Sequence, residues 1–151
     1  MSTRPNPQQI ADAVRAGMLE RDRATRALGM QVTAIGPGTA TVEMQVRDDM
    51  LNGFDICHGG FVTSLADSAF AFACNSYNEL TLAASLAIDL LAPARSGDVL
   101  TARASEVALA GRIGVYDIEV SNQRGERVAV MRGRSYRKKG LPVVSLDART
   151  P

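Results

Sequence analysis

The chain has 151 residues, 46% of them hydrophobic and 22% charged, with a formal net charge of +1. This length suits a single domain with its own core, and the near-neutral balance gives no sign of a nucleic-acid-binding or membrane-binding surface. No apolar run is long enough to span a bilayer, and the N-terminal residues lack the apolar core of a secretory signal. We therefore expect a cytoplasmic protein with neither nucleic acid nor membrane as a partner.

Metal-binding and nucleotide-binding motifs are absent from the sequence. One histidine and two cysteines, Cys57 and Cys74, do not have the number or spacing of a zinc site. There is no G-x-S-x-G nucleophile elbow and no Walker loop. The sequence predicts no metal and no resident cofactor, and it predicts that both thiols stay reduced.

The first predicted element is an amphipathic helix over residues 7–22. Asn6 and Gln9 can form a capping box at its start. Residues 24–30 follow as a link whose secondary structure the sequence does not decide, with Gly29 as a possible helix stop. The buried stripe of the helix consists of apolar side chains at helical spacing, Ile10, Ala13, Val14 and Met18.

Six strand-like segments come after the link, two before a long apolar helix and four after it. The first pair is separated by the turn residues Gly36, Pro37 and Gly38, and short turns join the last four. The first of these four is mostly apolar, as expected for a strand covered on both faces. The predicted strands are 31–35, 39–46, 82–91, 98–109, 114–121 and 127–138.

This order of elements predicts an α+β architecture in which antiparallel strands wrap one central helix. We expect one domain over residues 1–140, with its core in residues 29–139. Residues 141–151 contain Pro, Asp and Arg without a clear pattern. We expect this last segment to be a mobile tail.

The central stretch, residues 50–77, is the most informative part of the sequence. From Gly60 to Tyr77 large apolar residues recur at helical spacing, whereas a second face that includes Asp67 is small or polar. Besides His58, Asp67 is the only acidic or basic side chain from Ile56 to Asn78. A lone carboxylate in such a helix is costly unless it has partners or a chemical task, so we expect a catalytic group.

The start of this helix can stabilise negative charge. Backbone N–H groups are exposed there, and Gly59 and Gly60 let a substrate carbonyl approach them closely. An oxyanion donor together with a carboxylate suits acyl transfer. Asp67, however, follows Gly59 by eight residues, which is about 12 Å of helix. The two groups of one chain cannot both reach one carbonyl carbon, so we expect a two-fold dimer in which a second copy supplies the carboxylate.

The stretch LNGFDICHGGFVTSLADSAFAFACNS, followed by IDLLAPARSGDVLTA and GVYDIEVSNQRGERVAVMRGRSYR, resembles the hotdog-fold acyl-CoA thioesterases of the phenylacetate-degradation (PaaI-type) group. The resemblance covers roughly residues 29–137 and implies a hotdog fold, an antiparallel sheet wrapped around one long helix. It also implies homodimers with a continuous sheet, paired into homotetramers. The implied substrate is phenylacetyl-CoA or a related aromatic or medium-chain acyl-CoA, hydrolysed to free acid and CoA.

The resemblance assigns catalytic roles to five residues. Asp67 matches the acidic nucleophile or general base, and the sequence does not decide between these roles. Gly59 matches the backbone donor to the thioester carbonyl, and Asn52 matches a side chain near that carbonyl or its attacking water. His58 is expected to shape the turn before Gly59, and Ser85 matches a hydroxyl that holds the water beside Asp67.

The resemblance also places the coenzyme A arm along the strand after the helix and the next two turns. Coenzyme A is part of the substrate, not a resident cofactor, and its phosphates require cationic partners. The expected contacts with coenzyme A are Arg95, Gly97, Gly111, Arg112, Lys138 and Lys139. The expected lining of the acyl pocket is Leu51, Phe54, Phe61 and Leu65.

Three other interpretations stay open at the level of sequence. A hotdog dehydratase acting on 3-hydroxyacyl thioesters would pair His58 with a carboxylate. A non-catalytic acyl-CoA sensor would share the fold, although the N-terminal helix is too short for a helix-turn-helix pair. Asp67 could instead be structural, capped by Ser64 or Ser68. Asp89, a second acid in an apolar strand, lacks a neighbouring oxyanion turn and is interpreted as structural.

Overall fold

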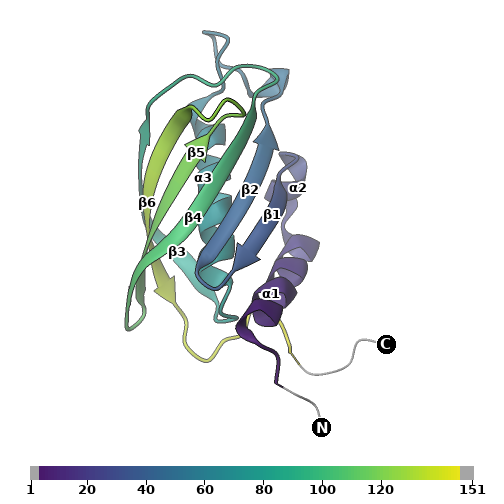
Figure 1. Cartoon of the computed structure of the whole chain (residues 1–151), viewed down its shortest axis with the longest axis vertical. Coiled ribbons are helices and arrows are strands. Elements are labelled where there is room, and N and C mark those ends of the chain that lie inside the picture. The colour runs from purple at the N-terminus through teal and green to yellow at the C-terminus, as the bar shows by residue number, and fades with distance from the viewer. Residues whose placement is uncertain (1–3, 147–151) are drawn as a thin grey trace.

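The computed structural model describes residues 4–146, which form a six-stranded antiparallel sheet with a long helix against one face (Figure 1). The strands follow the order β1-β2-β4-β5-β6-β3 across the sheet. Each lies within one residue of its predicted bounds, and the predicted α+β architecture is confirmed. The strands are β1 (Gln31–Gly36), β2 (Thr39–Gln45), β3 (Thr81–Leu90), β4 (Val99–Ala110), β5 (Ile113–Ser121) and β6 (Arg127–Arg137).

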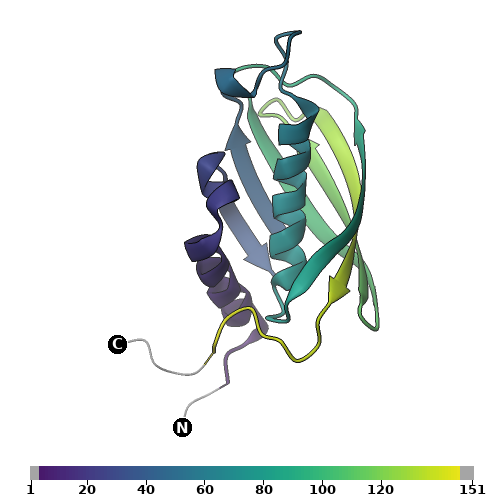
Figure 2. The ribbon, with the colours of Figure 1, turned by 180° about the vertical axis from the view of Figure 1, so that it is seen from behind.

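Of the three α-helices in residues 4–146, α3 lies against one face of the sheet, and α1 and α2 lie along its β1 edge (Figure 2). The predicted capping box forms at the first helix: Asn6 Oδ1 accepts from the Gln9 N–H at 2.8 Å, and Gln9 Oε1 accepts from the Asn6 N–H at 2.9 Å. The link that the sequence left open forms a second helix, because Asp22 caps it by accepting from the Thr25 N–H at 2.9 Å. Gly29 follows this helix with a φ of +67°. The helices are α1 (Pro7–Arg21), α2 (Arg23–Ala27) and α3 (Gly59–Asn75).

The core of the molecule lies between α3 and the sheet. Phe70 of α3 packs on Tyr116 of β5, with ring centroids 5.4 Å apart. The face of α3 that holds Asp67 is only partly buried and carries small or polar side chains, as predicted. The predicted apolar face is fully buried except at Phe61, which is partly buried; its buried members are Val62, Leu65, Ala69, Phe72 and Ala73.

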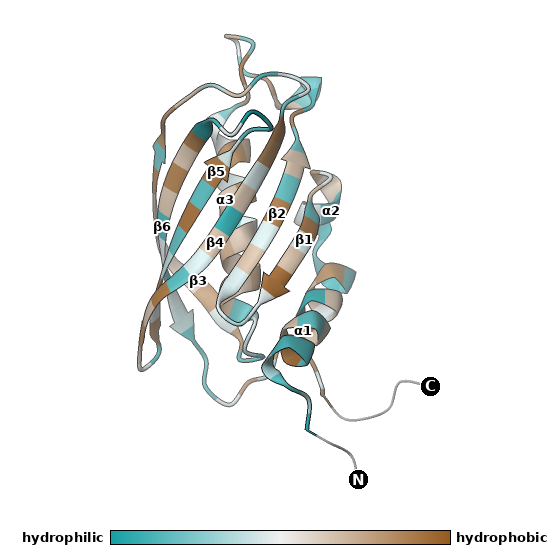
Figure 3. Ribbon diagram, viewed as in Figure 1, coloured by the Kyte–Doolittle hydropathy of each residue, from teal (hydrophilic) through white to brown (hydrophobic). Residues whose placement is uncertain are grey.

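The other face of the sheet carries charged side chains that alternate with buried apolar ones along β4, β5 and β6 (Figure 3). Oppositely charged residues pair across neighbouring strands on this outer face. Arg132 contacts Asp117 at 2.7 Å, and Arg127 contacts Glu119 at 2.9 Å. One face of the sheet therefore packs on α3 and the other is polar, which is common in antiparallel sheets.

Strand β3 departs from its prediction. The sequence predicts a strand covered on both faces, but β3 lies at the sheet edge. Among the strands of residues 4–146 it pairs only with β6, and it is exposed along most of its length. Leu82, Leu86 and Leu90 have exposed fractions of 49%, 39% and 55%. An apolar edge strand with free backbone groups is a template for pairing with another chain. The apolar composition of β3 thus fits cover supplied by a second copy, as the predicted dimer requires.

The described part of the C-terminal segment, residues 141–146, contacts the rest of the chain. Asn78, with a φ of +61°, accepts from the Val143 and Val144 N–H groups at 3.0 and 2.9 Å. The Leu80 N–H donates to the Leu141 carbonyl at 2.8 Å. The mobility that the sequence predicts for 141–151 stays a prediction, and residues 147–151 lie outside the described residues. No helix in residues 4–146 is long and apolar enough to span a membrane.

Candidate functional site

The start of α3 is built around His58, which caps the helix. Its Nδ1 accepts from the Gly60 N–H at 2.9 Å, so the proton of the neutral ring lies on Nε2. The His58 N–H donates to the Met50 carbonyl at 2.8 Å, which fixes the approach to the helix. Among residues 4–146, no acceptor contacts the N–H of Gly59, the first helical residue. His58 therefore shapes the turn, as predicted, and the Gly59 N–H stays available at the positive end of the helix.

Asn52 lies in the loop that leads to this turn. Its side-chain oxygen accepts from the Phe54 and Ile56 N–H groups at 2.9 and 3.4 Å, which folds the loop back on itself. Its Nδ2 has no acceptor among the described residues. Asn52 and Gly59 line one cavity of about 400 Å³. The structure thus brings together the predicted oxyanion donor and the predicted amide.

Asp67 lies in the middle of α3, on its partly buried face. Burial raises the pKa of its carboxyl above the ordinary value, and no hydrogen bond or charge offsets that effect. Ser64, one of the predicted structural caps, donates instead to the Gly60 carbonyl at 2.8 Å. No donor or cation in residues 4–146 contacts the Asp67 carboxylate. An unpaired, partly desolvated carboxylate favours a chemical task over a structural one.

A second cavity, of about 300 Å³, holds Asp67. Its lining is mostly apolar and comes mainly from α3 and from the start of β3, Thr81–Ala83. Neither Gly59 nor Asn52 reaches it. Within one chain, the predicted donors and the predicted carboxylate therefore line separate cavities, as the helical spacing of these residues predicts.

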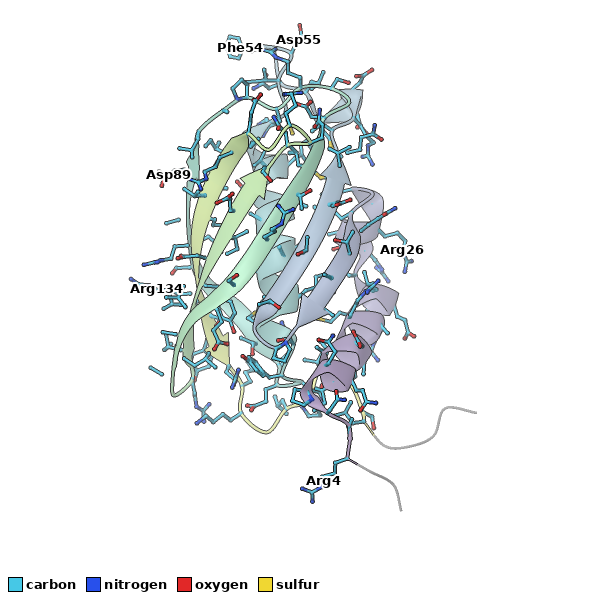
Figure 4. The ribbon with its side chains drawn as sticks, viewed as in Figure 1. Arg4, Arg26, Phe54, Asp55, Asp89 and Arg134 are labelled. Carbon is cyan, nitrogen blue, oxygen red and sulfur yellow. The ribbon has the colours of Figure 1, made fainter. Side chains whose placement is uncertain are left out.

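Ser85 is not brought next to Asp67 within one chain. A β-bulge between Ala83 and Ser85 shifts the register of β3, and Ser85 pairs with Arg134 of β6. Arg134 lies exposed at the outside of this sheet edge (Figure 4). Residues directly opposite in a ladder point to the same face, so Ser85 faces away from α3. The role that the resemblance assigns to Ser85 stays a prediction.

The six residues expected to contact coenzyme A lie at opposite ends of the sheet. Arg95 and Gly97 lie in the loop after β3, where the Cys57 N–H before α3 donates to the Ala94 carbonyl at 2.7 Å. The other four lie at the far end, where the Arg137 N–H donates to the Arg112 carbonyl at 2.8 Å. The four cationic side chains are exposed, and none forms a salt bridge within residues 4–146; they are Arg95, Arg112, Lys138 and Lys139.

The residues expected to line the acyl pocket lie in different environments. Phe54 is at the tip of the loop before α3, 85% exposed and pointing away from the body of the chain (Figure 4). Leu51 and Phe61 are partly buried against the core. Leu65 is fully buried in the core, so it can support a pocket wall but cannot contact a ligand.

Several residues of the two cavities were not predicted as site residues. The donor cavity includes Leu90, whose side chain lies close to Gly59. A Cβ added at Gly59 would be 2.6 Å from Leu90 Cδ1. The Asp67 cavity includes Met18 of α1 and Val143 of the C-terminal segment. Met18 was recognised only as a buried helix position, and no sequence signal marks Val143. Among the described residues, no group of His, Cys, Asp or Glu could hold a metal ion.

Comparisons with known proteins place this geometry in a family. Residues 54–129 match the family model described as Thioesterase superfamily. The chain is 46% identical over 120 residues to the acyl-coenzyme A thioesterase PaaI of Escherichia coli, covering 80% of this chain and 86% of that one. It is 36% identical over 129 residues to a putative esterase of Archaeoglobus fulgidus, covering 85% and 84%.

Solved structures agree with these matches. The structure of the E. coli PaaI protein from the phenylacetic acid degradation operon superposes with a TM-score of 0.88 at 42% identity, covering 90% of this chain and 99% of that one. The TT0310 protein of Thermus thermophilus gives a TM-score of 0.75 at 41% identity, covering 78% and 99%. The predicted hotdog fold and family are therefore confirmed, and the chain belongs to the thioesterase superfamily.

Proposed function

We propose that this thioesterase hydrolyses acyl-CoA to free acid and CoA, at a site that two chains share. The observation that carries the proposal is the division of the reactive groups between two cavities of one chain. Asn52 and the Gly59 N–H line one cavity, and the Asp67 carboxylate lies in the other. About 12 Å of helix separates Gly59 from Asp67, which is too far for both to act on one carbonyl.

Pairing of two β3 edges would join these two cavities, the half-sites of the shared site. The Asp67 cavity borders Leu82, near the start of β3, and the donor cavity borders Leu90, at its end. In an antiparallel pair with its two-fold axis at Leu86, Leu82 of one copy lies opposite Leu90 of the other. Each carboxylate half-site then faces a donor half-site, and the dimer has two equivalent sites. The exposed apolar side chains of β3 supply the area for this contact.

The chemistry follows from the joined groups. The thioester oxygen accepts from the Gly59 N–H, where the dipole of α3 stabilises the negative charge of the tetrahedral intermediate. Asn52 Nδ2 is free to donate to the same oxygen or to the attacking water. Asp67 of the other copy either attacks the carbonyl carbon or takes a proton from water as that water attacks. In both routes the C–S bond breaks, and the CoA thiolate leaves and takes up a proton. Direct attack gives a mixed anhydride, which water then hydrolyses to the free acid. Single-turnover hydrolysis in ¹⁸O-labelled water separates these routes, because only direct attack puts unlabelled carboxylate oxygen into the first product.

The cations at the two ends of the sheet support coenzyme A as the leaving group. In the antiparallel dimer, the end of one sheet that carries Arg95 lies beside the partner end that carries Arg112, Lys138 and Lys139. Exposed cations without carboxylate partners from both chains then surround one mouth of the site, where the CoA phosphates can bind. Phe54 and Leu51 on the loop before α3 are placed to reach the acyl group bound in the partner.

The acyl group that we propose is phenylacetyl or a related aromatic or medium-chain group, supported by the apolar lining of the Asp67 cavity and by the likeness to PaaI. Two such dimers would form the expected homotetramer. The dehydratase alternative is less favoured, because His58 uses Nδ1 to cap α3 and so has no free base at that atom.

The test is thiol release from a panel of acyl-CoAs, with phenylacetyl-CoA, benzoyl-CoA, hexanoyl-CoA and decanoyl-CoA as substrates. Loss of water from a 3-hydroxyacyl-CoA is followed in parallel. We expect thiol release to be the faster reaction by orders of magnitude. Water loss without thiol release would favour the dehydratase, and binding without either reaction would favour an acyl-CoA sensor. Light scattering of the same sample gives the mass of the assembly.

A further inference from the structure

We propose that α1 and the C-terminal segment 141–144 close the far end of the acyl pocket, and that Met18 and Val143 set the size of the acyl group that fits. This inference rests on the proposed function, because it concerns the substrate of the same site. It assigns specificity to two segments that lie outside the elements carrying the reactive groups, and that border the sheet and α3 from the side (Figure 2).

The cavity that holds Asp67 is the starting observation. All but two of its lining residues belong to α3, to β3 or to Leu80 just before β3. The exceptions are Met18 and Val143, which are far apart in sequence and meet at this cavity. Its lining is apolar apart from Asp67 and a few small polar groups. A hydrocarbon is the ligand that such a lining favours, whereas the CoA phosphates would be unstable there.

The position of Asp67 fixes which part of the substrate enters. Its carboxylate acts at the thioester carbon, and the acyl chain begins at that carbon. Space on the same side as Asp67, within the same cavity, is therefore available to the acyl chain, whereas the CoA arm leaves toward the cations at the sheet ends. The residues that close this space limit the length and width of the acyl group.

Val143 is held in place by specific contacts. Asn78 donates through Nδ2 to the Val144 carbonyl at 3.0 Å, in addition to accepting from the two N–H groups of Val143 and Val144. The next side chain, Val144, packs on Gly17 of α1, where any Cβ would overlap it. The segment is therefore anchored to the end of α3 on one side and to α1 on the other.

This anchoring also links Met18 to Val143. Gly17 precedes Met18 in α1, so the close contact of Val144 with Gly17 sets Val143 beside Met18 at the cavity. Both side chains are only partly buried. A change in their size should therefore alter the cavity without disrupting the fully buried core of α3 and the sheet.

The experiment compares kcat/KM for phenylacetyl-CoA and decanoyl-CoA in the full-length protein. Val143→Ala and Met18→Ala enlarge the cavity, and we expect each to raise the decanoyl-to-phenylacetyl ratio by about tenfold, the effect of one or a few methylene groups in an apolar pocket. Val143→Phe reduces the space and should lower the same ratio. Val107→Ala, an exposed valine on β4 away from both cavities, is the matched control and should leave the ratio unchanged.

The outcomes separate this inference from the proposed function. If the unmodified protein releases thiol from none of the substrates, the proposed function is wrong and the inference falls with it. If the unmodified protein is active but the ratio in all three variants equals that of Val107→Ala, only the inference is overturned. Melting temperatures identify any variant that has lost its fold. Val143→Ala makes the side chain at this half-buried position smaller and Val143→Phe makes it larger, so either variant, if folded, decides the question.

Discussion

The Gly59 N–H is the group whose removal gives the sharpest prediction. Gly59→Pro deletes this donor, and Gly59→Ala controls for the side-chain atoms that the proline adds. Gly59 is the first residue of α3, a position that proline favours because its N–H is not needed within the helix. His58 has a φ of −57° and a ψ of 132°, a conformation that a following proline allows. The helix should therefore start normally in the variant.

The expected loss can be estimated from comparable sites. Removal of one oxyanion donor from an acyl-transfer enzyme lowers kcat by about 10²- to 10³-fold. A new Cβ at position 59 would also approach Leu90 Cδ1 to 2.6 Å. Gly59→Ala adds the same Cβ and keeps the N–H, so it is the matched control. Because Leu90 Cδ1 is the end of a flexible side chain, we expect Gly59→Ala to lose far less activity than the proline variant.

The assay is thiol release from phenylacetyl-CoA at saturating and limiting concentrations, together with thermal unfolding of both variants. We expect kcat of Gly59→Pro to fall by about 10²-fold or more relative to Gly59→Ala, at similar melting temperature. Equal kcat values for the two folded variants would refute the oxyanion role of the Gly59 N–H, because they differ in that donor.

Two further predictions concern Asp67 and Asn78. Burial raises the pKa of Asp67 from its ordinary 3.8. Above the raised pKa the folded state holds a buried, ionised carboxylate, which lowers the free energy of unfolding. Below pH 3.8 the carboxyl is protonated in both the folded and the unfolded chain, and this cost disappears. Asp67→Asn should therefore abolish thiol release yet raise Tm at neutral pH, and a gain that persists unchanged at pH 3 would contradict this reasoning. Asn78→Gly keeps the left-handed φ of +61° but removes three hydrogen bonds to Val143 and Val144. Urea unfolding should show that the free energy of unfolding falls by about 1.5–4.5 kcal/mol. An unchanged free energy of unfolding would mean that Asn78 does not anchor the C-terminal segment.

Most of the fold was predictable because its signals are local. The capping box of Asn6 and Gln9, the turn at Gly36, Pro37 and Gly38, and the apolar spacing of α3 each involve a few consecutive residues. Such patterns determine where an element begins, ends and faces. The strand and helix bounds in the structure follow them closely.

The features that sequence could not give depend on distant contacts. The apolar composition of β3 indicates cover but not whether that cover comes from the same chain, and in one chain β3 is an exposed edge. The bulge after Ala83 turns Ser85 to the outer face, and a register shift leaves no mark in the residue pattern. Asn78 and Val144 are 66 residues apart, so no local pattern could connect them. Met18 lies at the Asp67 cavity because α1 packs against α3, which is also a contact between segments distant in sequence.

For the candidate site, the sequence predicted which residues to expect but not how deeply each side chain is buried. Gly59 was proposed from its place at the helix start and Asp67 from its isolation, and the spacing between them predicted separate positions within one chain. Asn52 and Gly59 do share one cavity. Leu65, assigned to a pocket wall, is completely buried in the core, and its place in that wall stays a prediction, since helical periodicity separates two faces but does not give depth.

The central claim is that one catalytic site contains groups from two chains, and subunit mixing tests it most directly. Asp67→Asn and Gly59→Pro are each expected to be inactive, and they are mixed in equal amounts after mild dissociation. Random pairing makes about half of the dimers mixed, and each mixed dimer has one site with both groups intact. We expect recovery of about a quarter of the unmodified activity. A mixture that exchanges subunits, as shown by mass spectrometry of tagged chains, and yet stays inactive would contradict a shared site.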